Sequence, residues 1–490
     1  MRSPGEAGRT DRRQPVPRLA RYGTAVHRGW HPVTLSAGIG VTTFVSACAG
    51  YALSTTLPVA AHQLAADRYL GWLFAVYLSG EVLGICLAPS LSRRGRPWVV
   101  QGLASALLVT GLCVAATADH AWVLITGRWM QGVGAGVVLV VVYELIARCY
   151  PPTARPRLIA LTSAALIVPG MVGPSVAGAM TSHWGWRSVF VALVVGTVLS
   201  AVLVIVPTRH MPRGAAPERS SFLMPAVVAF LALTGVQASG LVHSPLGIVV
   251  FLASIAALVL ALRRLLPTGV LALRPSVPAL VGLRFLLSAA YFGGQIWIPT
   301  MLIQVHRLSP EHAGLVMLGA PLGWAAGAMW QSRGFATASS THRRRRVAFG
   351  SLISGAGMGV LLIQTLSGLP LLLLGLLWTM SATGMGIANS TVTTGTLHAA
   401  TEHDAGVLSM AIQLADSVGS ALAIALGTLV REINPFAGQA RAGLAVIFAG
   451  AASLCVLAAV ASRQLTAIPR PLPAPACGVP RDSGRKARGW

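Results

Sequence analysis

Charged residues are scarce in this chain of 490 residues. Asp, Glu, Lys and Arg together make up 10% of it, against about 25% in an average soluble domain. Hydrophobic residues make up 54%, and the mean hydropathy is +0.69. A soluble enzyme of this length needs far more polar surface, and an intrinsically disordered chain is much less apolar. The composition therefore excludes both and leaves a protein that crosses a membrane several times.

Patterns typical of enzymes are also lacking. None of the six cysteines has the spacing of a disulfide framework or of metal ligands. We recognise no nucleophile–base pair, metal-binding cluster or phosphate-binding loop. The sequence therefore predicts a protein that is not an enzyme and that uses neither a metal nor another cofactor.

Apolar stretches of about 20 residues, the length of a helical membrane span, occur at fourteen places. The sequence thus predicts an all-α polytopic membrane protein with fourteen transmembrane helices. The spans are expected at residues 33–57, 70–91, 98–118, 121–147, 158–182, 188–207, 222–242, 245–263, 280–303, 312–332, 347–366, 369–396, 406–430 and 440–461.

Basic residues are the one abundant kind of charge, and they predict the orientation. The 37 Lys and Arg exceed the 13 Asp and Glu by 24, but the low charge density argues against nucleic acid as a partner. With both termini in the cytoplasm, the cytoplasmic segments hold 30 Lys and Arg residues and the outside segments hold 5. Cytoplasmic loops of membrane proteins carry this excess. We therefore expect both tails, residues 1–32 and 462–490, to be cytoplasmic.

Weak internal repetition divides the chain further. Pro58 and Pro299 close corresponding spans, and basic turns start at Arg93 and Arg343, at offsets of 241 and 250 residues. This predicts two pseudo-symmetric six-helix halves, residues 33–207 and 280–461, with a two-helix hairpin at 222–263 inserted at the periphery. Many transporters are built from such repeated halves, with the substrate site between them, although a structural protein could also show repeats.

The turn after the second span is short and basic. It contains Ser92, Arg93, Gly95 and Arg96. Any cytoplasmic hairpin between two spans needs a tight basic turn, so membrane topology is one explanation of the arginines and a functional role is the other.

The fourth span contains an arginine, which is costly in a membrane and is normally kept for pairing or proton relay. Arg128 is followed by Gln131 and Gly132, and the glycines of this segment allow a neighbouring helix to approach closely. Snorkelling of Arg128 to the outer surface is the alternative. The fifth span has Gly173, Pro174 and Gly178, a pattern that favours a bent, closely packed helix.

These three segments resemble the major facilitator superfamily, and within it the fourteen-helix drug:proton antiporters, over about residues 35–461. The resemblance implies a gating role for the basic turn, a proton-linked role for Arg128 and antiport for the Gly173–Gly178 segment. The chain departs from the family pattern at Ser92, which replaces an Asp, and at Gly50 in the first span, where an Asp is common.

Three acids lie within predicted spans: Glu81, Glu144 and Asp416. A carboxyl group in a membrane can exchange a proton near neutral pH, because burial disfavours its charged form. Gln413, Asp416 and Ser420 share one helix face, which should line a central cavity. We expect Asp416 and Glu81 to take turns in holding proton and substrate, while Arg128 favours proton release. Glu144 precedes Arg148 by four residues, so a plain interfacial ion pair is the alternative there.

Side chains suited to a large, mostly apolar ligand lie on spans nine, twelve and thirteen. They are Tyr291, Gln295, Trp297, Asn389, Gln413 and Trp378. Packing within the bundle is the alternative for the aromatic members. Arg284 lies at the cytoplasmic end of the ninth span and is expected to anchor it there.

The sequence therefore predicts a monomeric exporter in the cytoplasmic membrane of a bacterium. Its partners would be the lipid bilayer, protons and hydrophobic or amphipathic small molecules, and the proton motive force would drive export by alternating access. A metabolite facilitator or proton symporter of the same fold is the main alternative, and a membrane receptor without transport activity is a second.

Overall fold

The computed structural model describes residues 32–51, 53–150, 155–211, 223–241, 245–332, 340–367, 370–399, 405–433 and 440–465. Within these residues the chain is helical and has no strand. The predicted tails lie almost entirely outside the described residues, as do the side chains of Arg93 and Arg94.

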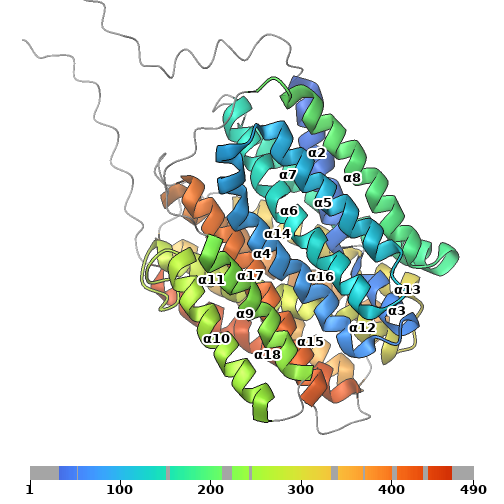
Figure 1. Ribbon diagram of the computed structural model, residues 1–490. Helices are drawn as coiled ribbons and strands as arrows, with labels where there is room; N and C mark the ends of the chain where they lie inside the picture. The colour runs from blue at the N-terminus through green and yellow to red at the C-terminus, as the bar shows by residue number, and fades with distance from the viewer. Residues whose placement is uncertain are drawn as a thin grey trace, which may run out of the picture.

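Two groups of helices pack mainly among themselves. The first group comprises α2 (Pro32–Tyr51), α3 (Leu53–Gln63), α4 (Leu70–Arg94), α5 (Pro97–Ala116), α6 (Ala121–Cys149), α7 (Arg155–Trp184) and α8 (Arg187–Thr208). The second comprises α11 (Val277–Gln295), α12 (Ile298–Gln304), α13 (Pro310–Met317), α14 (Gly319–Ser332), α15 (Ser340–Ser367), α16 (Leu371–Ala399), α17 (Ala405–Ile433) and α18 (Ala440–Ala461). Figure 1 shows the two groups side by side.

A hairpin of α9 (Leu223–Leu241) and α10 (Pro245–Leu265) connects the groups. It was expected at the periphery, and this is true of α10, whose apolar side chains such as Leu252 and Leu260 are about 60% exposed. In contrast, α9 packs against both α4 and α17. Small residues such as Ala226 and Ala229 form this contact and are completely buried, so α9 covers the seam between the groups.

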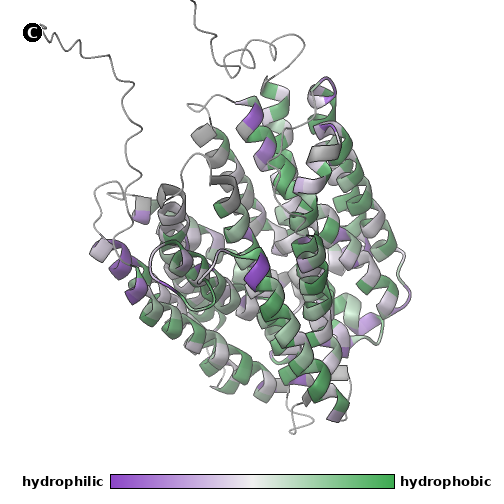
Figure 2. Ribbon diagram, turned by 60° about the vertical axis from the view of Figure 1, so that its left-hand side comes forward, coloured by the Kyte–Doolittle hydropathy of each residue, from purple (hydrophilic) through white to green (hydrophobic). Residues whose placement is uncertain are grey.

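Twelve of the described helical segments are long and apolar enough to cross a membrane. Two of the fourteen predicted spans are not among them. The first corresponds to α7, a helix of 30 residues, and the second to α9, whose apolar stretch is shorter than the others. Hydrophobic residues run along the helices, and hydrophilic ones lie mainly near their ends (Figure 2). The chain is thus a polytopic, all-helical membrane protein.

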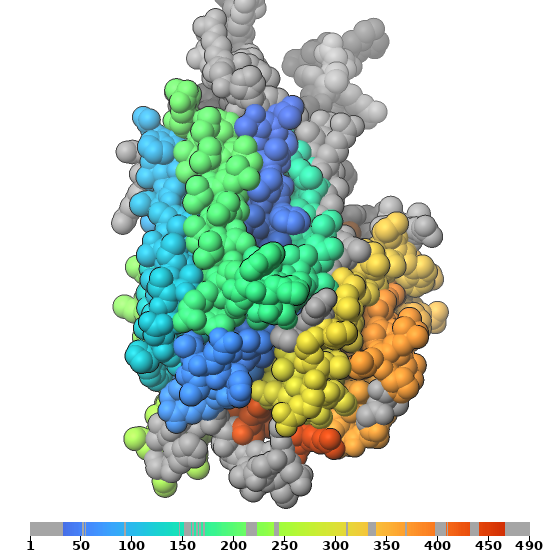
Figure 3. Space-filling model, turned by 90° about the vertical axis from the view of Figure 1, so that its right-hand side faces the viewer, coloured from blue at the N-terminus to red at the C-terminus, as the bar shows by residue number. Residues whose placement is uncertain are grey.

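Arginines gather where α4, α6 and α10 end and where α15 begins. We call this side of the bundle the arginine-rich end. At the opposite end α3 packs against α7, α12 and α13, so the two groups meet there (Figure 3). Thr55 donates a hydrogen bond to the Pro174 carbonyl oxygen over 3.1 Å, and a Cβ atom on Gly314 would lie 2.7 Å from that oxygen. The groups are therefore in close backbone contact opposite the arginine-rich end.

Glycines bring α4 and α6 into backbone contact in the middle of the first group. A Cβ atom on Gly132 would lie 2.0 Å from the Tyr77 carbonyl oxygen, and one on Gly136 would lie 2.3 Å from that of Glu81. A larger side chain at either contact would push the two helices apart. The glycines of α6 thus determine where α4 presents Tyr77 and Glu81.

Candidate functional site

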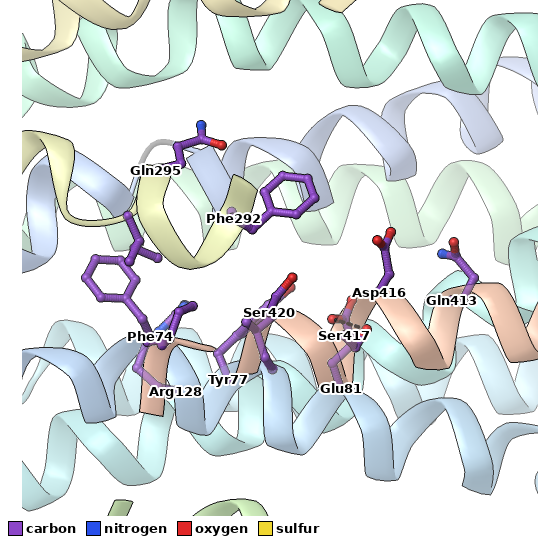
Figure 4. A pocket seen from close by; sticks show the side chains of 14 residues that line it. Phe74, Tyr77, Glu81, Arg128, Phe292, Gln295, Gln413, Asp416, Ser417 and Ser420 are labelled. Atoms are coloured by element: carbon purple, nitrogen blue, oxygen red, sulfur yellow. Dashed lines mark hydrogen bonds between the residues drawn. The ribbon is translucent and has the colours of Figure 1, made fainter. Parts of the chain in front are cut away.

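A cavity of about 240 Å³ lies between the two groups of helices (Figure 4). Its walls come mainly from α4, α11 and α17, with Gly50 of α2 and Arg128 of α6. The lining residues are Gly50, Phe74, Tyr77, Leu78, Glu81, Arg128, Phe292, Gln295, Ile296, Gln413, Asp416, Ser417, Ser420 and Ile424. The cavity thus combines apolar walls with a few convergent charged and amide groups, as small-molecule sites commonly do.

Arg128 lies at one end of this cavity and is only 2% exposed, so it does not snorkel to the surface. Its Nε donates to the Leu73 carbonyl oxygen over 3.0 Å, and its Nη1 donates to Gln131 Oε1 over 2.7 Å. The guanidinium stacks on the Tyr77 ring, 4.4 Å from the ring centre. Among the described residues no carboxylate pairs with Arg128, so its charge is balanced by the ring face and by neutral acceptors.

Gln131 anchors this arrangement, because its Nε2 donates to the Gly111 carbonyl oxygen of α5 over 3.0 Å. The Arg128–Gln131–Gly132 segment therefore joins α4, α5 and α6 at the depth of the cavity. Its amide and guanidinium are both buried and hydrogen-bonded, which is how polar groups are tolerated in a membrane protein interior.

Asp416 of α17 forms an ion pair with Arg284 of α11. The Arg284 Nε donates to Asp416 Oδ1 over 2.8 Å, its Nη2 donates to Oδ2, and Ser288 also donates to Oδ1. The remaining Nη1 of Arg284 donates to Asn389 and, over 2.9 Å, to Thr393, both on α16. This bidentate geometry is the strongest form of an arginine–carboxylate contact, and it joins three helices of the second group.

Arg284 is thus not the surface anchor that its position in the sequence suggested. Its side chain is only 10% exposed, and its guanidinium points toward Asp416 rather than toward the membrane surface. Arg284 and Ser288 are four residues apart in the sequence and therefore share one face of α11. This spacing does not reveal that the shared face of α11 is turned toward Asp416 of α17.

Glu81 of α4 faces the second group across the cavity. Its Oε2 accepts a hydrogen bond of 3.0 Å from Ser417 of α17, next to Asp416 in the sequence. In the described part of the chain no basic side chain lies within ion-pair distance of Glu81. The contact between Glu81 and Ser417 is therefore a hydrogen bond between the two helix groups. Ser417 was not among the predicted site residues, because it lies one residue off the helix face that Gln413, Asp416 and Ser420 share.

Glu144 forms an ion pair of 2.9 Å with Arg148 on the same helix, with both side chains about a quarter exposed. This is the interfacial pair that the spacing offered as an alternative. The pair lies at the arginine-rich end of α6, away from the residues that line the cavity.

The residues predicted to bind substrate fall into two sets. Gln295 and Gln413 line the cavity, whereas Asn389 accepts a hydrogen bond from Arg284. The three aromatic candidates are almost completely buried: Tyr291 and Trp378 stack with ring centres 5.0 Å apart, and Trp297 is 1% exposed. Their contacts favour packing within the second group over contact with a ligand.

The predicted gating residues lie outside the cavity. Ser92 is 7% exposed near the end of α4, Gly95 caps that helix, and Arg96 precedes α5. Gly173, Pro174 and Gly178 are buried in α7, where the Pro174 carbonyl oxygen contacts α3 and α13. The α7 segment is thus part of the seam between the groups.

Comparison with known proteins gives one family. The family model of the Major Facilitator Superfamily matches residues 39–424. The methylenomycin A resistance protein of Bacillus subtilis is 25% identical over 432 residues, which cover 78% of this chain and 90% of the relative. A probable multidrug-efflux transporter of Mycobacterium tuberculosis is 25% identical over 443 residues, which cover 85% of this chain and 91% of the relative.

Solved structures agree in fold. An autoinhibited peptide transporter of the POT family superposes with a TM-score of 0.64 at 13% identity, covering 89% of this chain and 99% of its own. The xylose transporter XylE of Escherichia coli, in a partially occluded inward-open conformation, superposes with a TM-score of 0.59 at 16% identity, covering 87% and 96%. At these identities the likeness concerns the fold alone.

Proposed function

Because this chain belongs to the Major Facilitator Superfamily, we propose that it exports hydrophobic or amphipathic small molecules in exchange for protons. The resemblance to drug:proton antiporters drawn from the sequence motifs agrees with the names of two relatives that are 25% identical, a methylenomycin A resistance protein and a probable multidrug-efflux transporter. Antiport by this chain rests on the chemistry of its cavity.

The observation that supports antiport most directly is a pair of acids in the central cavity. Glu81 and Asp416 belong to different helix groups, and both line the same space. The aromatic and aliphatic wall, with Phe74, Leu78 and Phe292, suits an apolar ligand body. A carboxyl group in such a site can hold either a proton or a polar group of the ligand, and this competition links the two fluxes.

Alternating access follows from the arrangement of the groups. We propose that they rock about the seam at α4, α17 and α9, with the cavity at its centre. The close contacts of α3 with α7, α12 and α13 support a state that is closed at the end opposite the arginine-rich one. Since cytoplasmic loops are rich in arginine, this state would face the cytoplasm.

The membrane topology is part of the same proposal. We infer that α7 and α9 also cross the bilayer, which gives fourteen spans and places both termini in the bacterial cytoplasm. The length of α7, 30 residues, and the packing of α9 between α4 and α17 support this. We propose that the transporter acts as a monomer, because the cavity is complete within one chain.

Inside-out membrane vesicles with an imposed acidic interior provide the test. Addition of ethidium or methylenomycin A should dissipate the pH gradient, and the gradient should drive uptake of the compound. Vesicles that lack the protein are the control. Uptake that proceeds equally well without any gradient, and that moves no protons, would refute antiport.

A facilitator of the same fold is the second candidate. Gly50 lines the cavity at the position where the related antiporters often carry an acid, so one carboxyl group of their coupling scheme is absent. The vesicle experiment separates the two, because a facilitator equilibrates its substrate without regard to the pH gradient.

A further inference from the structure

The two cavity acids are held in very different ways, although they lie on facing helices. We propose that Glu81 alone exchanges the coupling proton, and that Arg284 is a positioning residue that keeps Asp416 ionised throughout the transport cycle. This inference rests on the proposed proton-coupled export and assigns its coupling to one carboxyl group.

The carboxylate form of Asp416 is stabilised by hydrogen-bond donors from two neighbouring side chains. Its two oxygens accept hydrogen bonds from the Nε and Nη2 of Arg284 and from Ser288. A proton on Asp416 would leave the Arg284 guanidinium as an unpaired charge with only 10% of its side chain exposed. Loss of one member of a buried ion pair is strongly unfavourable, since the remaining charge is uncompensated.

The ion pair also lies within a single rigid unit. Arg284 and Ser288 are on α11, Asp416 is on α17, and Asn389 and Thr393, which accept from Arg284, are on α16. These helices pack together in the second group. When the groups rock against each other, the cluster moves as one body, so nothing in the motion separates the two charges.

Glu81 differs in both respects. One serine hydroxyl donates to it, and no basic side chain of the described residues pairs with it. Gain of a proton therefore removes a charge from the cavity without creating an unpaired one. The hydrogen bond to Ser417 also joins the two helix groups, so the motion that opens the cavity changes the surroundings of Glu81.

The charged and titratable groups around Glu81 support this division. They are Tyr77 on its own helix, Arg128 on α6, and Asp416 with its partner Arg284 on α17 and α11. Tyr143 of α6 lies near the ion pair of Arg284 and Asp416. The Arg128 guanidinium donates hydrogen bonds to Leu73 and Gln131 and stacks on the Tyr77 ring, so it does not pair with Glu81. The stretch of α9 between Leu223 and Leu241, which also packs against α4, has no charged residue. Among the described residues that line the cavity, Asp416 is the one carboxylate that would repel the charge of Glu81, and Arg284 compensates it.

Purified protein in liposomes allows the two roles to be separated with ethidium as the probe. Two rates are measured: ethidium counterflow without a pH gradient, which needs no net proton movement, and uptake driven by a pH gradient. In Glu81→Gln the pH gradient should no longer stimulate uptake above the variant's own counterflow rate. The double variant Arg284→Gln with Asp416→Asn removes both charges together. Whatever its counterflow rate, the pH gradient should still stimulate its uptake above that rate. Asp119→Asn is the control for neutralising a carboxyl group, because the Asp119 side chain is exposed and does not line the cavity.

The single variant Asp416→Asn leaves Arg284 unpaired and should lower counterflow itself, which is the expected effect of a positioning role. A double variant that retains counterflow but loses stimulation would overturn the proposal, because Asp416 would then carry the proton. Gradient stimulation in Glu81→Gln would overturn it equally.

If the double variant shows no counterflow, infrared difference spectroscopy identifies which carboxyl group takes up the proton. A pH titration of the wild-type protein should show the C=O stretching band of a protonated carboxyl group, and Glu81→Gln should lack it. Persistence of the band in Glu81→Gln would contradict the assignment. If wild-type uptake ignores the pH gradient while the band still depends on Glu81, the proposed antiport fails and the assignment of the titrating group survives.

Discussion

The contact between α4 and α6 yields the sharpest prediction about how the site is held. A methyl group in Gly132→Ala would lie 2.0 Å from the Tyr77 carbonyl oxygen and 3.1 Å from the Glu81 backbone nitrogen. Ordinary contact begins near 3.4 Å, so α4 has to move by about 1.4 Å. Such overpacking costs about 1–3 kcal/mol, and replacing a helical glycine by alanine gains about 1 kcal/mol, so the net loss of stability is up to about 2 kcal/mol.

Gly132→Ala should therefore lower the melting temperature by roughly a few degrees in detergent, followed by tryptophan fluorescence. It should also slow gradient-driven ethidium uptake, because a displaced α4 moves Glu81 relative to Ser417. Gly359→Ala is the matched control, since nothing lies within 4 Å of the added methyl group. It should leave stability unchanged or slightly higher. If Gly132→Ala and Gly359→Ala behave alike, the close contact that positions Glu81 does not exist.

Three further variants test the assignment of roles among the predicted site residues. Glu144→Gln removes a partly exposed ion pair with Arg148, so it should change stability by less than about 1 kcal/mol. Gradient-driven uptake should stay intact, and loss of that uptake would show that Glu144 takes part in proton coupling. Trp378→Ala empties a fully buried position and should lower stability by about 3–5 kcal/mol, measured by thermal unfolding, while the surviving protein keeps its order of preference among dyes. Gln413→Ala should change the order of preference among dyes in a competition assay, because its amide lines the cavity. Its melting temperature should stay nearly constant.

Features that depend on helix composition were predictable from the sequence. The apolar runs predicted a polytopic helical membrane protein, and twelve described segments are long and apolar enough to cross a membrane. The segment around Arg128 and Gly132 pointed to the superfamily that the chain belongs to. Close approach of a helix at the glycines of α6 was also foreseen, and the structure shows it against Tyr77 and Glu81.

Features that depend on how helices face one another were not predictable. Arg284 looked like an end anchor, because the sequence does not say that α11 turns it toward Asp416. Trp378 and Tyr291 had the residue types of a ligand site, but they stack on each other. The role of α9 was missed for the same reason, since its small residues gave no sign that it packs against two helices far apart in the sequence.

The most direct test of proton-coupled export is the pH gradient at which net substrate flux stops. In liposomes that contain the purified protein, a fixed ethidium gradient is opposed by pH gradients of increasing size, and the direction of net flux is recorded. A proton antiporter should reverse direction at a finite pH gradient, and Glu81→Gln should lose this reversal while it still equilibrates ethidium. Flux that always runs down the ethidium gradient in the wild-type protein would contradict the account.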